Sequence, residues 1–151
     1  MKNLIKSFGY AFQGIFSMMK ERNFRIEISA ATAVIWFSAL YGLSSEKWIL
    51  LIIIISSVLS GEMINTSIEK ICDKISKEKD INIKKIKDTA AGSVMLRAVA
   101  ALVCAVFLFG NTDRLSFVFS MFLSPVRFII LSVFAFLSVL FIFLPEKKKR
   151  K

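Results

Sequence analysis

The segment between Glu62 and Asp73 carries the side chains of this chain that are best suited to chemistry. Three acids and an amide recur there at spacings of three and four residues: Glu62, Asn65, Glu69 and Asp73. On an α-helix, which turns about 100° per residue, these positions fall within a sector of about 80° and extend over about 16 Å. A set of carboxylate ligands that includes no His or Cys favours a hard cation such as Mg²⁺, which proteins hold with one or two carboxylates plus substrate phosphates.

The upper part of this acidic face lies within an apolar stretch of the sequence. An Asp at the centre of a membrane helix costs about 2.5–3.5 kcal/mol on an insertion scale, so an acid there indicates a functional site facing the interior of a bundle. The alternative is structural. Asn65, Thr66 and Ser67 would then make hydrogen bonds between packed helices, and the acids would be solvated at the membrane surface.

Two further polar clusters flank other apolar stretches. They are Glu21-Arg22-Asn23-Phe24-Arg25-Ile26-Glu27 and Lys87-Asp88-Thr89-Ala90-Ala91-Gly92-Ser93. The small residues of the second cluster allow close helix packing, and they could equally leave room for a ligand. The sequence contains neither a Gly-rich phosphate loop with GK[ST] nor a protein-kinase signature, so any phosphate must be handled by metal and side chains.

The elements that position these residues are predicted to be membrane helices. Of the 151 residues, 56% are apolar, against about 45–50% in a soluble domain, and the 15 Phe residues exclude a disordered chain. Because about 20 apolar residues cross the hydrocarbon layer, the sequence predicts four spans, at 28–43, 48–68, 89–109 and 128–144. The chain lacks His, and Cys72 and Cys104 match no metal or redox spacing, so a zinc site and a disulfide scaffold are not expected.

The basic residues predict how the spans are oriented. Segments 1–27, 70–88 and 146–151 hold 5, 7 and 5 Lys and Arg residues, which together make 17 of the 21 in the chain. The positive-inside rule therefore places the N-terminus, the loop after the second span and the basic tail in the cytoplasm. A nucleic-acid partner is not expected, because these clusters flank spans and no base-reading motif accompanies them. The tail is expected to contact acidic membrane lipids.

The N-terminal segment is predicted to be an amphipathic helix on the membrane surface. One sector gathers the apolar residues Leu4, Ile5, Phe8, Phe12, Ile15, Phe16 and Met19, and the other side carries Lys2, Lys6, Gln13 and Lys20. The alternative is an ordinary helix that packs on the core of a small soluble subdomain. A removable signal peptide does not fit, because the first 27 residues contain no compact apolar core with a cleavage site.

These motifs together resemble the prokaryotic diacylglycerol kinase/undecaprenol kinase family of small integral-membrane lipid kinases. Over residues 4–109 the matching elements occur in family order and at family spacing: Ser7-Phe8-Gly9-Tyr10-Ala11-Phe12-Gln13-Gly14, Glu21-Arg22-Asn23-Phe24-Arg25, Glu62-x-x-Asn65-x-x-x-Glu69-x-x-x-Asp73 and Lys87-Asp88-x-Ala90-Ala91. Each motif alone would be weak evidence, whereas the set is highly specific.

The resemblance implies a Mg²⁺-dependent transfer of the γ-phosphoryl group of ATP to a membrane lipid alcohol. It also implies a homotrimer with shared active sites in the bacterial plasma membrane. Glu62 matches the general base, which also meets the lipid, and Glu21 and Glu69 match the Mg²⁺ ligands. The positions that match the nucleotide site, besides those two acids, are Tyr10, Asn65, Asp73, Lys87 and Asp88. Phe24, Arg25 and Glu27 match the region that approaches the lipid.

The predicted fold class is therefore an all-α integral membrane helical bundle. It comprises a cytoplasmic amphipathic helix with its connection (1–27), a three-span lipid-kinase core (28–109) and a fourth span with a basic tail (110–151). The fourth span and Arg97, a charge within the third span, depart from the family pattern. Arg97 is expected to pair with an acid or to extend toward the membrane surface.

The substrate is expected to be undecaprenol rather than diacylglycerol. The run from Glu21 to Ile26 resembles the Gram-positive undecaprenol branch, although Glu27 stands where that branch often has His. A proton-coupled four-span transporter is the alternative of another class. It fits less well, because a transporter site should lie near the membrane midplane.

Overall fold

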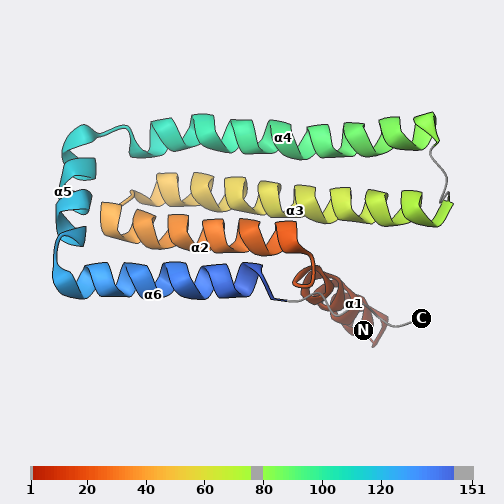
Figure 1. The fold of residues 1–151 in the computed structure, drawn as a ribbon, viewed down its shortest axis with the longest axis horizontal. Coiled ribbons are helices and arrows are strands. Elements are labelled where there is room, and N and C mark those ends of the chain that lie inside the picture. The colour runs from red at the N-terminus through yellow and green to blue at the C-terminus, as the bar shows by residue number, and fades with distance from the viewer. Residues whose placement is uncertain (1, 76–79, 145–151) are drawn as a thin grey trace.

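The computed structural model describes residues 2–75 and 80–144, and all regular structure within these ranges is α-helical. The helices are α1 (Lys2–Met18), α2 (Arg22–Tyr41), α3 (Ser45–Ile75), α4 (Ile81–Phe109), α5 (Thr112–Phe122) and α6 (Pro125–Ile142). The long helices α2, α3, α4 and α6 form a bundle, and α5 crosses one end of it (Figure 1). The predicted all-α bundle is confirmed.

Four of these helices, α2, α3, α4 and α6, are long and apolar enough to cross a membrane. Large apolar side chains on their outer faces are exposed, for example Leu102 on α4 and Phe136 on α6, and no residue of α6 is buried. A soluble monomer does not expose continuous apolar surface on this scale. The chain is therefore a multi-pass membrane protein, as the sequence predicted.

The observed helices differ from the predicted spans at several ends, and α3 and α4 extend furthest beyond them, on to Ile75 and back to Ile81. α2 begins at Arg22, so residues 22–27 form its first turns and do not belong to a connection. α6 begins at Pro125 and not at residue 128, because Ser124 has the extended backbone of an N-cap and proline is well suited to the first helical turn. The sequence did not predict α5, whose first turn is capped by the Asn111 side chain accepting from the Arg114 backbone N–H at 2.9 Å.

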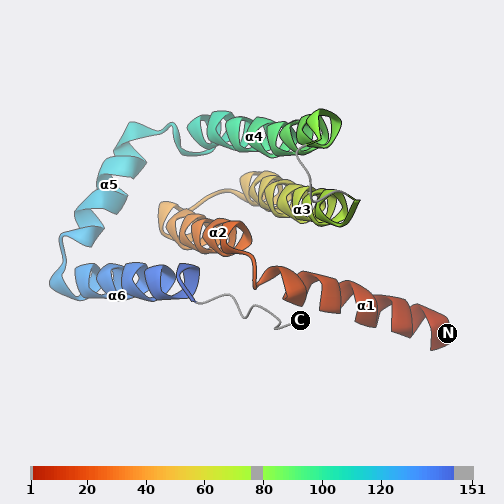
Figure 2. The ribbon, with the colours of Figure 1, turned by 45° about the vertical axis from the view of Figure 1, so that its right-hand side comes forward.

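α1 extends away from the bundle (Figure 2). Its apolar residues Leu4, Phe8, Phe12 and Phe16 are all exposed. This arrangement supports the predicted surface helix and disfavours the alternative of a helix packed on a soluble core. One detail differs, because α1 ends at Met18, which is buried, and Met19 lies beyond it.

The most extensive helix contact joins α3 to α4. At its centre Arg97 of α4 packs over Gly61 of α3, where a Cβ atom would lie 2.7 Å from Arg97 Nη1 and 2.8 Å from Cδ. Arg97 Nη1 donates to the Ser93 hydroxyl at 3.2 Å. Within the described residues Arg97 forms no ion pair, so its guanidinium is satisfied on its own helix, one turn toward the start of α4.

Polar side chains and an apolar core hold the bundle together at the end where α5 lies, which we call the far end. The Tyr41 hydroxyl accepts from the Asn111 backbone N–H at 3.1 Å, and Lys47 Nζ donates to the Leu108 carbonyl at 3.1 Å. Tyr41 and Leu108 also belong to a buried apolar cluster with Leu51 and Val118. The opposite end, where α2 and α4 begin and α3 and α6 end, carries the acids and is called the acidic end.

Gly61→Leu should destabilise the bundle, because its side chain must displace Arg97. We expect a loss of about 1–3 kcal/mol in the free energy of unfolding, which is typical of overpacking, measured by thermal unfolding in detergent micelles. The matched control is Gly92→Leu, since no atom lies within 4 Å of a Cβ at Gly92. Equal losses in the two variants would contradict the close α3–α4 contact.

Candidate active site

The predicted acidic face of α3 is present at the acidic end of the bundle. Glu62 and Asn65 are 4% and 5% exposed. The Asn65 side-chain amide donates to Glu69 Oε1 at 3.2 Å and also reaches the Glu62 carboxylate. The two acids are therefore linked through one amide, which was not predicted in detail but follows from their spacing on one face.

α2 supplies a second set of polar groups to Glu62. The Asn23 side chain hydrogen-bonds the Glu62 carboxylate, and Glu27 lies close enough to interact with it electrostatically. One carboxylate oxygen of Glu27 is buried and has no hydrogen-bond partner in the described part of the chain. A buried acceptor without a partner is costly, so this oxygen is available to a donor from a ligand.

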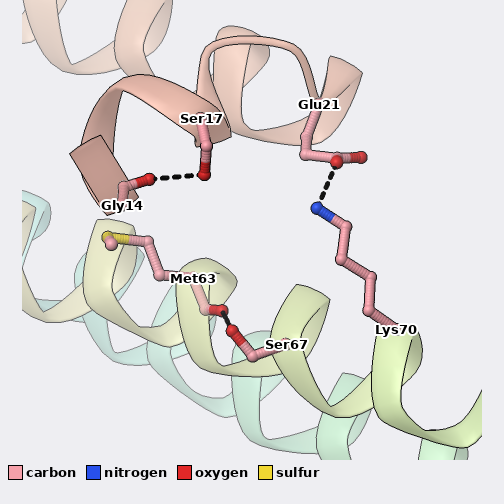
Figure 3. Close-up of polar contacts among 6 residues, drawn as sticks. All are labelled: Gly14, Ser17, Glu21, Met63, Ser67 and Lys70. Atoms are coloured by element: carbon pink, nitrogen blue, oxygen red, sulfur yellow. Dashed lines mark hydrogen bonds and ion pairs between the residues drawn. The ribbon is translucent and has the colours of Figure 1, made fainter. Parts of the chain in front are cut away.

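The connection between α1 and α2 contributes Glu21 to the same region. Glu21 Oε1 lies 2.6 Å from Lys70 Nζ of α3, and Figure 3 shows the two side chains reaching toward each other. Glu21 also interacts electrostatically with Glu62. Sequence reasoning missed Lys70, although its position directly after Glu69 would have been a signal that a basic group borders the acidic face.

In the first turns of α4, Lys87 contacts the acidic face of α3, whereas Asp88 does not. Lys87 Nζ donates to Asp73 Oδ1, which joins α4 to the last turns of α3. Asp88 is exposed and makes no hydrogen bond or ion pair among residues 2–75 and 80–144. Because neighbouring residues point about 100° apart on a helix, Lys87 and Asp88 cannot both face α3.

Three other predicted site residues are placed differently from the rest. Tyr10 is 68% exposed on α1, away from the acids. Phe24 is buried, and so is Arg25. Arg25 Nη1 donates to the carbonyls of Phe141 at 3.1 Å and Leu144 at 2.7 Å, so its guanidinium is engaged by the end of α6.

An apolar groove of about 390 Å³ runs between α2, α3 and α4 toward this cluster. Among the described residues, Glu27 is the only polar side chain that lines it. The remaining lining comes from Ala30, Ala31, Val34, Leu51, Ile54, Ile55, Val58, Leu59, Ala98, Ala101, Leu102, Ala105, Leu108 and Phe109. The groove is therefore apolar along its length toward the far end. At the acidic end it reaches the acids through Glu27.

The cluster contains oxygen groups that fit a hard divalent cation. No group of three or more His, Cys, Asp and Glu residues within the described ranges forms a ready-made metal cage. Mg²⁺ does not need three protein ligands, because one or two carboxylates together with substrate phosphates hold it. The Asn65 side-chain oxygen is buried without a partner, and Glu69 lies beside it, whereas Glu21 is paired with Lys70. The oxygens of Asn65 and Glu69 are therefore the part of this cluster that fits a cation.

Comparison with known proteins gives consistent results. The family model described as "Prokaryotic diacylglycerol kinase" matches residues 9–109. The chain is 34% identical over 110 residues to undecaprenol kinase of Bacillus subtilis (strain 168), covering 72% of this chain and 89% of that protein. It is 35% identical over 103 residues to diacylglycerol kinase of a Synechocystis strain, covering 67% of this chain and 59% of that protein. No solved structure matches the chain significantly.

Proposed function

The chain belongs to the prokaryotic diacylglycerol kinase family, whose named relatives are lipid kinases, and from that premise we propose that it phosphorylates undecaprenol with ATP. The observation that carries this proposal is the apolar groove that ends at Glu27, beside Glu62. A long hydrocarbon chain lying in the groove would bring its terminal hydroxyl to the two carboxylates.

The lining of the groove favours a polyprenol over diacylglycerol as the substrate. Diacylglycerol carries two ester groups within a few bonds of its hydroxyl, and buried ester oxygens need polar partners. Within residues 2–75 and 80–144, Glu27, an acceptor when ionised, is the only polar side chain along the groove. A polyprenol has one hydroxyl on pure hydrocarbon, which matches this lining, and the name of the Bacillus relative agrees. Diacylglycerol remains the second candidate, on the name of the Synechocystis relative.

Glu62 is proposed as the general base of the transfer. Its carboxylate takes the proton of the lipid hydroxyl while the hydroxyl oxygen attacks the γ-phosphorus of ATP, and the bond to the β-phosphate oxygen breaks to release ADP. Asn23 and Asn65 orient the Glu62 carboxylate through hydrogen bonds. Glu27 borders the lipid head at the end of the groove, and its unpartnered oxygen is left for a second donor, because the single hydroxyl proton goes to Glu62.

The nucleotide is proposed to bind where α3 meets α4 and the α1–α2 connection. Glu21 and Glu69 would hold Mg²⁺, which would supply positive charge to the phosphates of the nucleotide. Lys70 and Lys87 add positive charge near the phosphates, and Asp73 orients Lys87. Phosphoryl transfer depends mainly on such positioning and charge stabilisation.

The remaining parts of the proposal concern assembly and orientation. Tyr10 and Asp88 are exposed and make no hydrogen bond or ion pair with the other described residues of this site, and we propose that a homotrimer brings them to the nucleotide of a neighbouring copy. Both termini are proposed to be cytoplasmic in the bacterial plasma membrane, because ATP is cytosolic and most basic residues of the described ranges belong to α1, the start of α2, the end of α3 or the start of α4. The basic tail, 147–151, lies outside the described residues.

A proton-coupled transporter fits the geometry less well. Intramembrane acids of a transporter should gather near the membrane midplane. Here the acids Glu21, Glu62, Glu69 and Asp73 lie at one end of the bundle, with Lys70 and Lys87 beside them. This arrangement suits a phosphate site at a membrane surface.

Glu62→Gln should lower the turnover number for lipid phosphorylation by about 10²–10⁴-fold, the usual contribution of a general base. The binding of ATP with Mg²⁺ should change by less than about threefold, because Glu62 is proposed to contact the lipid and not the phosphates. Glu46→Gln at the far end is the matched control and should behave as the wild type. Retained turnover in Glu62→Gln would remove the base role.

Ala101→Phe should raise the KM for the lipid, because a phenyl ring at this position fills part of the groove. We expect about a tenfold rise, the effect of losing roughly 1.4 kcal/mol of binding, with the KM for ATP unchanged. The control is Ala135→Phe on the exposed face of α6. An unchanged lipid KM in Ala101→Phe would mean that the lipid does not lie in this groove.

A further inference from the structure

The end of α6 is bound by two arginines from the first turns of α2. Arg25 Nη1 donates to the Phe141 and Leu144 carbonyls, and the Arg22 guanidinium lies over the Phe143 ring, 4.9 Å from its centroid. The α6 end and the α2 start lie at the same end of the bundle (Figure 1). The two helices therefore meet where the candidate active site is built.

This contact provides a hydrogen-bond partner for the last carbonyls of α6 and for the buried Arg25 guanidinium of α2. The last carbonyls of a helix lack intrahelical partners and carry partial negative charge. α6 has no basic residue in its last turn and ends at Phe143 without a left-handed glycine. Arg25 supplies the missing donor, and because it is 4% exposed, its charge needs these carbonyls in return.

α2 divides its residues between two nearly opposite faces. At about 100° per residue, Arg22, Arg25, Ser29 and Thr32 share one face. The α2–α6 groove of about 270 Å³ includes Ser29 and Thr32 in its lining, opposite Ser138 of α6. The contact with α6 therefore lies along one face of α2.

The other face of α2 carries the groups that serve the site. Asn23 hydrogen-bonds Glu62, and Glu27 opens onto the apolar groove with Ala30 and Ala31. Asn23 and Glu27 lie about 140° and about 180° around the helix from the centre of the α6 face. Any rotation or outward shift of the α2 start would move Asn23 and Glu27 away from Glu62.

We propose that the fourth span is a positioning element for the active site, and that Arg25 is the positioning residue through which it acts. Arg25 ties the end of α6 to the start of α2 and so holds Asn23 and Glu27 against Glu62. This inference rests on the proposed function, since the site that it positions is the lipid phosphorylation site. It also gives residues 110–144, which lie beyond the family match at 9–109, a role in catalysis.

A direct contact between Arg25 and a substrate phosphate is the competing explanation. The two explanations differ in what can replace Arg25. If Arg25 acts through α6, an artificial link between α2 and α6 should restore activity to Arg25→Met. If Arg25 binds substrate, no such link can restore it.

The experiment uses the full chain with Ser29→Cys and Ser138→Cys, in a background of Cys72→Ala and Cys104→Ala. A short reversible thiol cross-linker then joins α2 to α6 across their groove. Arg25→Met should lower kcat for lipid phosphorylation by about 10–100-fold, as expected for a small misplacement of reacting groups. Cross-linking should restore kcat to within about threefold of the Arg25 protein, and reduction of the link should abolish the rescue.

Three controls keep the test interpretable. The cross-linked protein that retains Arg25 should keep its kcat, and mass spectrometry should confirm that the link has formed. If Arg25→Met does not purify as a folded protein, Arg25→Gln, which keeps a neutral donor, replaces it. A formed link that fails to restore kcat would overturn the positioning role.

A second readout does not depend on activity. Spin labels on the two thiols introduced by Ser29→Cys and Ser138→Cys, without the cross-linker, report the distance between α2 and α6. Arg25→Met should lengthen or broaden that distance distribution, and an unchanged distribution would overturn the proposal. If the protein that retains Arg25 phosphorylates no lipid, the proposed function fails, whereas this distance readout still decides whether Arg25 holds α6.

Discussion

A carboxylate buried at the edge of an apolar bundle must have polar partners, and the packing of the acidic end follows from this constraint. Glu62 is 4% exposed, and an acid near hydrocarbon costs several kcal/mol unless neighbouring groups compensate. Its partners come from two helices, as Asn65 lies one turn along α3 and Asn23 lies on α2. α2 must therefore start close to α3 at this level, and this requirement also brings Glu27 and Glu21 toward Glu62.

Much of this arrangement is readable from the sequence, because it depends on periodicity and length. Four apolar stretches predict four spans, and the spacing of Glu62, Asn65 and Glu69 predicts one polar face on α3. The contacts between helices could not be predicted in the same way. Lys70 pairs with Glu21 only because the α1–α2 connection folds back over α3, and this path depends on tertiary packing that no local pattern encodes.

The contact between Arg25 and α6 is a second tertiary contact that could not be predicted from the sequence. The motif of Arg25 points to a region near the lipid, whereas the structure engages its guanidinium with the carbonyls at the end of α6. The sequence separates these groups by more than 110 residues, and backbone carbonyls have no residue type to signal them.

We propose that a lipid alcohol in the apolar groove receives phosphate beside Glu62. The most direct test offers undecaprenol and diacylglycerol separately to purified protein in mixed micelles, with labelled ATP, with and without Mg²⁺. We expect label in undecaprenol that requires Mg²⁺ and exceeds the label in diacylglycerol. Preferential label in diacylglycerol would contradict the substrate assignment, and no label in either lipid from folded protein would contradict the assignment of the acidic face to phosphoryl transfer.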